Sequence, residues 1–423
     1  MVAQAGKKNA WRLRTESAQP WRDRLRAGNP DKYFMVSADS HINEPIDFFE
    51  GRIPEEYRSR LPHVRTDADG TQWLITEGWT PQLVRVPKGR EDLLPSKEEF
   101  ENYDVIAAYT DKMEDEDVLR QVAGRTVEGR RKDWKIEGVD AEIAFPNKGA
   151  LSFATPDTKF AAIMCHAWND WAREFYKDVF EITLPMALIP AGDVELAIKE
   201  VQWAAANNFH GLLLPNRPVY SRLDQPRFPL EYNDKVFEPL WSAIAETGLP
   251  ITFHVSTGED PRAVRGNGGA IINYVSHAIT TTLEPLVQMI ASGVFERHRS
   301  LRAGASESGI GWVPWLLHQM DHGYRAHHMW VRPVIPRLPS EYFREHCFSS
   351  FIEEREALEQ CIALGLEDNL LWSNDYPHHE GTYPHSALAI ERQMGSLTET
   401  QRAKVLGENA RNIFKIKPAA ANA

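Results

Sequence analysis

Short apolar runs alternate with longer stretches of helical periodicity along most of this chain, and the alternation leaves few folds open. Between the runs, apolar residues recur at i, i+3 and i+4, as on the buried face of an amphipathic helix. Repeated strand–helix units build a parallel sheet, and eight of them close most simply into a barrel. We therefore predict an α/β fold, a distorted (β/α)8 TIM barrel. The predicted strands are YFMVSADSHI (33–42), AEIAFP (141–146), TLPMAL (183–188), GLLLP (211–215), PITFHV (250–255), LRAGAS (301–306), HCFSSF (346–351) and NLLWSND (369–375).

Three segments fall outside this repeating pattern. Residues 1–30 are polar and rich in Arg and Lys, so we expect an N-terminal arm that wraps a neighbour or stays mobile. Residues from about 51 to 104 are irregular, and TDADGTQWLITEGW within them is typical of a hairpin. We expect an insertion there, lying over the barrel mouth. The barrel is predicted to span residues 31–416, followed by a disordered tail, 417–423.

The charge balance limits the partners. The chain of 423 residues has a net charge of -12 and a pI near 5.7, which argues against a nucleic acid or an anionic membrane as partner. No apolar run is long enough to span a bilayer, and three widely spaced cysteines fit no disulfide framework. We expect a cytoplasmic protein with a small-molecule substrate, forming a homo- or hetero-oligomer. The pairs Arg130–Arg131 and His327–His328 are expected to be surface features.

Polar residues that follow the apolar part of a strand are informative, because the reactive face of a parallel barrel lies at the carboxyl ends of its strands. Asp39 and His41 end the first strand, and alternation along a strand turns both side chains the same way. A carboxylate and an imidazole can then converge on one divalent cation. Glu44 follows within reach and is a further candidate ligand. The sequence therefore predicts a metal site at this strand end.

Two later strands also end in candidate metal-binding residues. His254 ends the strand in PITFHVSTGED, where the alternative is a hydrogen-bonded core histidine. Its place at a strand end favours the metal site. Glu307 follows the strand in ASESGIGWVPW, where the alternative is a carboxylate at the N-terminus of the next helix. The Gly-x-Gly after Glu307 lacks the spacing of a dinucleotide-binding loop, so no nucleotide cofactor is expected.

The last predicted strand runs into a loop crowded with ionisable groups, LLWSNDYPHHEGTYPHS. Asp375 is best placed to bind the metal or to act as a general base, because a water bound to a cation needs a carboxylate nearby to take its proton. His378, His379 and Glu380 follow, and we take His379 as a further catalytic candidate.

These motifs together resemble the amidohydrolase-related family, the branch of the amidohydrolase superfamily that includes aminocarboxymuconate-semialdehyde decarboxylase. The resemblance runs from about Tyr33 to Ile416 and rests on DSHINEP, FHVSTG, ESGIGWVPWLL and WSNDYPH. It implies a distorted (β/α)8 barrel with a divalent metal ion. The ligands that the resemblance implies are Asp39, His41, His254 and Asp375.

Two departures from the family pattern bear on the reaction. The first strand carries Asp-x-His, where the family's decarboxylases have other pairs such as His-x-His. The sixth-strand position that holds a catalytic histidine in those decarboxylases is Ser306-Glu307 here. Many hydrolases of the superfamily bridge two metals with a carboxylated lysine, which GLLLPNRP does not offer. If two metals bind, Glu44, Glu307 and His379 must supply the extra ligands.

Three functional hypotheses stay open. The first is a metal-dependent hydrolase or decarboxylase of a small carboxylate- or amide-containing substrate, with Asp375 handling the proton and Glu307 or His379 as the acid. The second is an O2-using dinuclear iron or manganese hydroxylase, because family members with Asp-x-His and Glu-Ser-Gly motifs, such as 2-aminoisobutyrate hydroxylase, resemble non-haem dinuclear enzymes. The third is a catalytically silent metal-binding subunit of a hetero-oligomer, which polar ligands at all four strand ends disfavour. The donors suit zinc as well as iron or manganese, one or two ions per chain.

Overall fold

The structure is a computed structural model that describes most of the chain. The described residues are 19–45, 47–49, 51–85, 123–218, 230–258, 270–327, 334–378 and 380–417.

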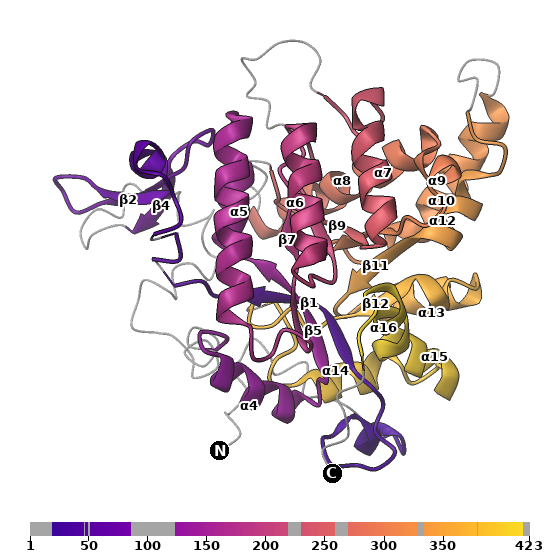
Figure 1. The fold of residues 1–423 in the computed structure, drawn as a ribbon. Coiled ribbons are helices and arrows are strands. Elements are labelled where there is room, and N and C mark those ends of the chain that lie inside the picture. Colours follow the sequence, from indigo (N-terminus) through magenta and orange to yellow (C-terminus); the bar gives the residue numbers. More distant parts are fainter. Residues whose placement is uncertain are drawn as a thin grey trace.

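Parallel strands form the centre of the molecule (Figure 1). They are β1 (Val36–Ile42), β5 (Ala141–Pro146), β6 (Thr183–Pro185), β7 (Ala187–Leu188), β8 (Leu212–Leu214), β9 (Ile251–His254), β10 (Ala303–Ser306), β11 (Cys347–Phe351) and β12 (Leu370–Trp372). Strands that neighbour one another in space also follow one another in sequence, in the orders β1-β5-β6 and β7-β8-β9-β10-β11-β12. This is the arrangement expected of successive strand–helix units.

Backbone contacts link the two sheets at both ends. Only Met186 separates β6 from β7, and its N–H donates to the carbonyl of Ala144 in β5. At the other end, Ser40 of β1 forms a parallel bridge with Tyr376, which follows β12. Each of the eight predicted runs contains a strand, and the run 183–188 is divided into β6 and β7. The predicted TIM-barrel fold is confirmed.

Helices connect successive strands and cover the outside of the barrel. They are α4 (Val127–Glu137), α5 (Thr158–Phe175), α6 (Val194–Ala206), α7 (Glu238–Thr247), α8 (Ala270–Ala291), α9 (Val294–Arg297), α10 (Trp312–Ala326), α12 (Pro339–His346), α13 (Arg355–Ala363), α14 (Ser386–Gln393), α15 (Glu399–Ala403) and α16 (Asn409–Ile413). In Figure 1, α5, α6 and α7 stand side by side in front of the strands. Side-chain oxygens of Thr126, Asp157 and Asp193 accept backbone hydrogen bonds at the starts of α4, α5 and α6, which explains where these helices begin.

Short helical turns complete the chain. They are η2 (Arg22–Leu25), η3 (Glu55–Arg60), η5 (Gly149–Phe153), η6 (Lys235–Phe237), η8 (Glu367–Asn369) and a π-helical turn η9 (Lys404–Glu408). The barrel interior is filled by apolar side chains of Leu188, Leu213, Phe348 and Leu371, all buried in one cluster. A Cβ at Gly304 of β10 would lie 2.1 Å from the ring of Phe348, so only glycine fits beside it.

The insertion forms a small antiparallel sheet beside the N-terminal end of α5, in the order β2 (His63–Thr66), β3 (Gln72–Ile75) and β4 (Gln82–Arg85) (Figure 1). The predicted hairpin is the β2–β3 pair. Arg60 binds the carboxylates of Glu77 and Asp157 at 2.6 and 2.9 Å, and so ties the sheet to the start of α5. Residues 86–104 of the expected insertion lie outside the described residues.

The described part of the expected arm, residues 19–30, packs against helices near the C-terminus of the same chain. Arg22 pairs with Glu391 of α14 at 3.0 Å, and Arg402 of α15 lies 4.4 Å from the ring centre of Trp21. The arm's first residues, 1–18, and the expected tail beyond residue 417 are outside the described residues, so the predictions of a wrapping or mobile arm and a disordered tail stay predictions there.

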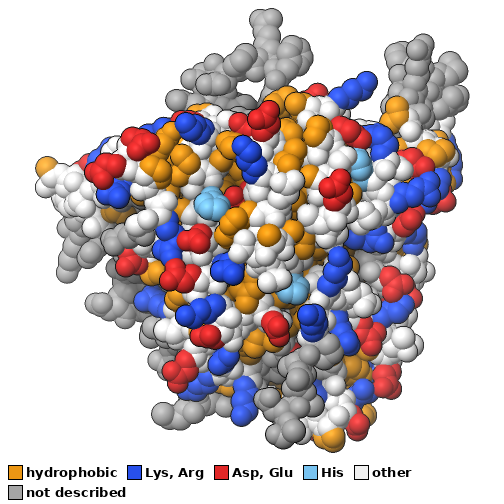
Figure 2. Space-filling view, in the orientation of Figure 1, with side chains coloured by type: hydrophobic (Ala, Val, Ile, Leu, Met, Phe, Trp, Pro, Cys, Tyr) orange, Lys and Arg blue, Asp and Glu red, His pale blue; other side chains and the backbone are white. Residues whose placement is uncertain are grey.

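The surface and the helices carry two further findings. On the face shown in Figure 2, Lys and Arg side chains are interspersed with Asp and Glu rather than gathered into one basic field. None of the helices in the described ranges combines the length and the apolar composition needed to cross a membrane.

Candidate metal centre

Side chains from four strand ends meet in the barrel. Asp39 and His41 belong to β1, His254 ends β9, Glu307 follows β10 and Asp375 follows β12. His254 Nε2 lies 3.0 Å from Glu307 Oε2 and 3.4 Å from Asp39 Oδ1. His41 Nε2 lies 3.3 Å from Asp375 Oδ1 and 3.4 Å from Glu307 Oε2. Five of the six metal ligands that the sequence predicted are therefore brought together.

His378 joins this group, although the sequence had singled it out only as one of the ionisable residues that follow Asp375. Its Nδ1 lies 3.3 Å from Asp375 Oδ1, and its ring stacks on His41 with 3.8 Å between ring centres. Its other nitrogen, Nε2, lies 3.0 Å from the side-chain oxygen of Asn147. The sequence does indicate His378, because it lies only three residues after Asp375. The adjacent His379 made it unclear which of the two histidines faces the cluster.

The candidate ligands form two overlapping sets, and within each set the donor atoms lie within 4.8 Å of one another. One set is Asp39, His41, His254 and Glu307, and the other is His41, Glu307, Asp375 and His378. Carboxylate oxygens and imidazole nitrogens are donors that suit zinc, manganese and iron. The geometry therefore offers places for one or two divalent ions.

Unpartnered polar atoms support the presence of a cation here. The carboxylate oxygens of Asp39 and Asp375 and the Nε2 atoms of His41 and His254 are buried and form no hydrogen bond of normal geometry. Burying polar groups without partners costs free energy, and burying charged ones costs more. A divalent cation would give each of these atoms a partner, so the residues fit a metal ion.

Hydrogen bonds around His254 fix which of its nitrogens can bind a metal. Its Nδ1 lies 2.9 Å from the carbonyl oxygen of Val255, which can only accept, so Nδ1 carries a proton and Nε2 is the nitrogen that faces the cluster and can bind a metal. The Asn216 side chain donates to the His254 carbonyl at 2.9 Å. The ligand is thereby held at both its ring and its backbone.

The ionisable groups of the cluster shift one another's pKa. Burial raises the pKa of Asp39. Burial also opposes ionisation of Glu307, but the imidazoles of His254 and His41 outweigh it and hold the pKa of that carboxyl well below its usual range. Burial disfavours the charged form of His378, yet the neighbouring Asp375 carboxylate dominates and raises the pKa of His378 to about 10. Against the opposing effect of burial, nearby carboxylates also raise the pKa of His254, so without a metal the charged imidazoles of His254 and His378 face the carboxylates of the cluster.

The backbone is strained at two of the candidate ligands. Glu307 has φ 57° and Asp375 has φ 49°, in the left-handed region that residues other than glycine seldom adopt. Such conformations cost on the order of 1 kcal/mol or more each and concentrate at functional sites. A hydrogen bond from the Asp375 N–H to the Asp39 carbonyl ties the strained residue to the first strand.

Glu44 is not among the grouped ligands. Its carboxylate accepts hydrogen bonds from the backbone N–H groups of Asn147, Lys148 and Gly149, and from the indole of Trp168 at 2.9 Å. These donors occupy the oxygens, so Glu44 anchors the loop after β5 instead of facing the metal cluster. His379, the remaining catalytic candidate, lies outside the described residues.

The alternative role of Glu307, capping the next helix, is taken by another residue. The carboxylate of Glu354 accepts hydrogen bonds from the N–H groups of Ile310 and Gly311 at the start of α10. Glu307 is therefore not needed as a cap for α10, and its Oε2 faces the two histidines of the cluster.

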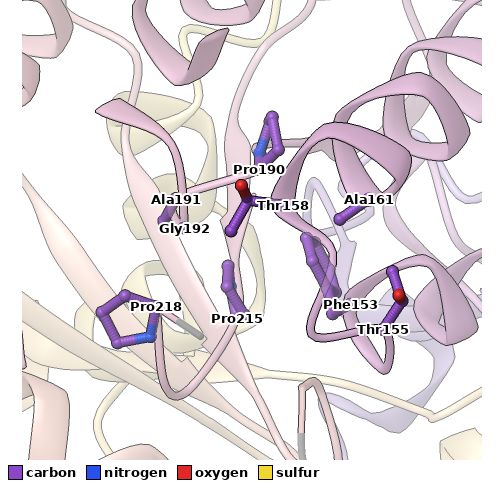
Figure 3. A pocket seen from close by; sticks show the side chains of 9 residues that line it. All are labelled: Phe153, Thr155, Thr158, Ala161, Pro190, Ala191, Gly192, Pro215 and Pro218. Carbon is purple, nitrogen blue, oxygen red and sulfur yellow. The ribbon is translucent and has the colours of Figure 1, made fainter. Parts of the chain in front are cut away.

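A small cavity, shown in Figure 3, lies elsewhere and is lined by residues that follow β5, β7 and β8 in the chain. Its lining includes Phe153, Thr155, Pro190 and Pro215. Its volume of about 10 Å³ holds no more than one water molecule, so it cannot hold a substrate.

Residues 131–416, more than half of the chain, match the amidohydrolase family. A relative from Dictyostelium discoideum, 2-amino-3-carboxymuconate-6-semialdehyde decarboxylase, is 29% identical over 133 residues, which are 31% of this chain and 36% of the relative. The chain thus matches little more than a third of that relative's length.

Solved structures share the fold. An amidohydrolase from Mycobacterium avium subsp. paratuberculosis has a TM-score of 0.69 at 20% identity, covering 90% of this chain and 99% of that chain. A 5-carboxyvanillate decarboxylase from Novosphingobium aromaticivorans, solved with manganese and 4-hydroxy-3-methoxy-5-nitrobenzoic acid, has a TM-score of 0.63 at 16% identity, covering 94% and 100%.

A parallel barrel with histidines and carboxylates gathered at its strand ends defines a class of metal-binding barrel enzymes. Within that class the chain belongs to the amidohydrolase family, and the resemblance seen in the sequence motifs is confirmed.

Proposed function

We propose that this protein is a divalent-metal-dependent decarboxylase that acts on a small carboxylate. The observation that carries the proposal is the convergence of buried carboxylates and imidazoles from four strand ends, with donor atoms within 4.8 Å of one another in each set. The names of the Dictyostelium relative and of the manganese-bound structural neighbour favour decarboxylation over hydrolysis of an amide or ester. The proposed metal ligands are Asp39, His41, His254 and Asp375.

When bound, the cation would polarise the substrate's oxygens and fix its orientation. Decarboxylation breaks a carbon–carbon bond, releases CO2 and leaves an electron pair on carbon, which then needs a proton. His378 lies directly beside the proposed ligand Asp375, and its raised pKa keeps a proton on the imidazole, so it is the described group best suited to deliver that proton. Glu307, whose pKa is held low, is suited to accept a proton rather than to donate one. The proposed donor is thus an imidazole from the loop after β12, in place of the family's sixth-strand histidine.

The test is CO2 release under argon. Protein loaded with Mn²⁺ or Zn²⁺ would be incubated with a panel of hydroxybenzoates and other small carboxylates. We expect CO2 and product in equal amounts, loss of activity after chelation, and at least a hundredfold loss in Asp375→Asn. The exposed Asp23→Asn serves as the matched control. Cleavage of amides or esters without CO2 release would replace this proposal with a hydrolase.

A second candidate function rests on the second donor set, His41, Glu307, Asp375 and His378. Two ions per chain would fit the two overlapping sets. Iron or manganese in a carboxylate-rich site is also suited to O2-dependent hydroxylation. Two equivalents of iron or manganese, together with product formation only in air, would favour that function. One equivalent and full activity under argon would rule it out.

A further inference from the structure

Arg130 is buried, contrary to the expectation that Arg130 and Arg131 are both surface features. It lies in the first turn of α4 and is 0% exposed. Arg131 is exposed and donates to the carbonyl of Asp178 at 3.0 Å. A guanidinium is removed from water only at a large cost, which close partners must offset. The groups that bind the buried guanidinium therefore indicate the role of Arg130.

One partner is Glu142 of β5. The guanidinium binds both oxygens of its carboxylate, with 2.9 Å between Nη2 and Oε2. The hydroxyls of Ser40 and Thr183 donate to the same carboxylate at 2.6 and 3.0 Å. The ion pair is thus fully hydrogen-bonded, and it lies where β1 and β5 meet.

The second partner is the backbone of a proposed metal ligand. Nη1 and Nη2 of Arg130 both donate to the carbonyl oxygen of His41, each at 2.9 Å. The N–H of His41 donates to the carbonyl of Tyr376. Both backbone polar groups of this ligand residue are therefore held, one of them by a side chain that reaches in from outside the barrel.

The third partner links Arg130 to the loop after β12, which lies next to β1. The ring of Tyr376, the residue after Asp375, lies 5.0 Å from the guanidinium carbon. Gly124 closes over both groups, because a Cβ there would lie 2.9 Å from Nη1 and 3.3 Å from the Tyr376 ring. One guanidinium thus touches the segments that carry three of the four proposed ligands, those of β1 and of the loop after β12.

We infer that Arg130 is a positioning residue of the metal centre, which sets the place of His41, and with it of Asp39, against Asp375. The inference rests on the proposed function, because it assumes that these residues bind a metal. Metal ligands need placement within about 0.5 Å, and loss of a supporting hydrogen bond lowers metal affinity about 10–100-fold. A lysine cannot replace the planar, five-donor guanidinium, since its point charge cannot serve Glu142 and the His41 carbonyl together.

The test measures the dissociation constant for Mn²⁺ by competition with a chelator, together with thermal unfolding. Arg130→Lys should weaken Mn²⁺ binding at least tenfold, and Arg131→Met, the matched control, should not change it. The double variant Arg130→Met/Glu142→Leu removes the whole ion pair, so it should recover much of the stability lost in Arg130→Met while keeping the weakened Mn²⁺ binding. If Arg130 had only a structural role, the double variant would recover its affinity for Mn²⁺ together with its stability.

Wild-type affinity for Mn²⁺ in either folded variant, Arg130→Lys or the double variant, overturns the inference. If Arg130→Met alone fails to fold, those two variants carry the test. Failure of the proposed function looks different, because the wild-type protein itself would then bind no metal, or would bind it without releasing CO2 from any substrate.

Discussion

Asp39→Asn should stabilise the metal-free protein while reducing its response to metal. Asp39 is buried, and burial raises the pKa of its carboxyl. An acid whose pKa is higher in the folded than in the unfolded chain stabilises the fold fully only below its unfolded pKa, and that contribution is lost as pH rises through the folded pKa. At neutral pH the metal-free protein therefore bears a cost at Asp39 that an amide of the same shape avoids.

The expected size follows from the environment of the carboxylate. Burial outweighs the nearby imidazoles at Asp39, and relief of one such poorly compensated buried polar group is worth about 1–3 kcal/mol. For a chain of this length, an unfolding entropy of about 2 cal/mol/K per residue makes 1 kcal/mol roughly 1 °C in Tm. Mn²⁺ at about 1,000 times its Kd would stabilise the wild-type protein by about 4 kcal/mol, or roughly 4–5 °C. Asp39→Asn lacks one ligand, so Mn²⁺ should stabilise it less. The variant should therefore have the higher Tm without metal, and the wild-type protein the higher Tm with metal.

Scanning calorimetry at pH 7, in EDTA and in excess Mn²⁺, measures both effects. Asp23→Asn, at a carboxylate with a 75% exposed side chain, is the control and should follow the wild-type protein in both conditions. A lower Tm for Asp39→Asn in EDTA, combined with an undiminished response to Mn²⁺, would refute the reasoning. That outcome would make Asp39 an ordinary partner in a structural ion pair.

Other residues give further expectations. Glu44→Gln should lower the unfolding free energy by about 1–3 kcal/mol in urea, because four donors lose a charged acceptor, while metals per chain stay unchanged. Burial raises the pKa of Glu137 to about 7, so the wild-type protein should lose up to about 3 kcal/mol of stability between pH 5 and pH 8, and Glu137→Gln should remove that loss in urea titrations at both pH values. Gly304→Val should destabilise the fold by at least about 2 kcal/mol through overlap with Phe348, and an unchanged urea midpoint would contradict the packing described.

The strands and most of the candidate metal cluster could be predicted because they depend on local pattern. Alternation places Asp39 and His41 on one side of β1, and parallel strands bring their carboxyl ends to one edge. Glu44 shows where that reasoning ends. It follows the same strand, but its partners are backbone N–H groups about a hundred residues later in the chain, a contact that no local pattern contains.

The same limit applies to Arg130 and Glu307. A charged residue in a helix with few apolar residues, such as Arg130 in α4, is expected on the surface. Only the packing of α4 against β1 and β5 shows that its guanidinium is buried. The sequence allowed Glu307 to be either a metal ligand or the cap of α10. Which role it takes depends on Glu354, a residue of a different strand–helix unit, which accepts the hydrogen bonds at the start of α10. Long-range pairing of polar groups decided each case.

The most direct test of the metal centre is elemental analysis of protein purified without oxygen and counted per chain. We predict one or two equivalents of a divalent metal in the wild-type protein, about the same in Glu44→Gln, and a small fraction of an equivalent in His254→Ala. Glu307→Gln should lose one of two equivalents if both donor sets are filled. A folded wild-type protein that takes up no manganese, iron or zinc, even when these are supplied, would contradict the account.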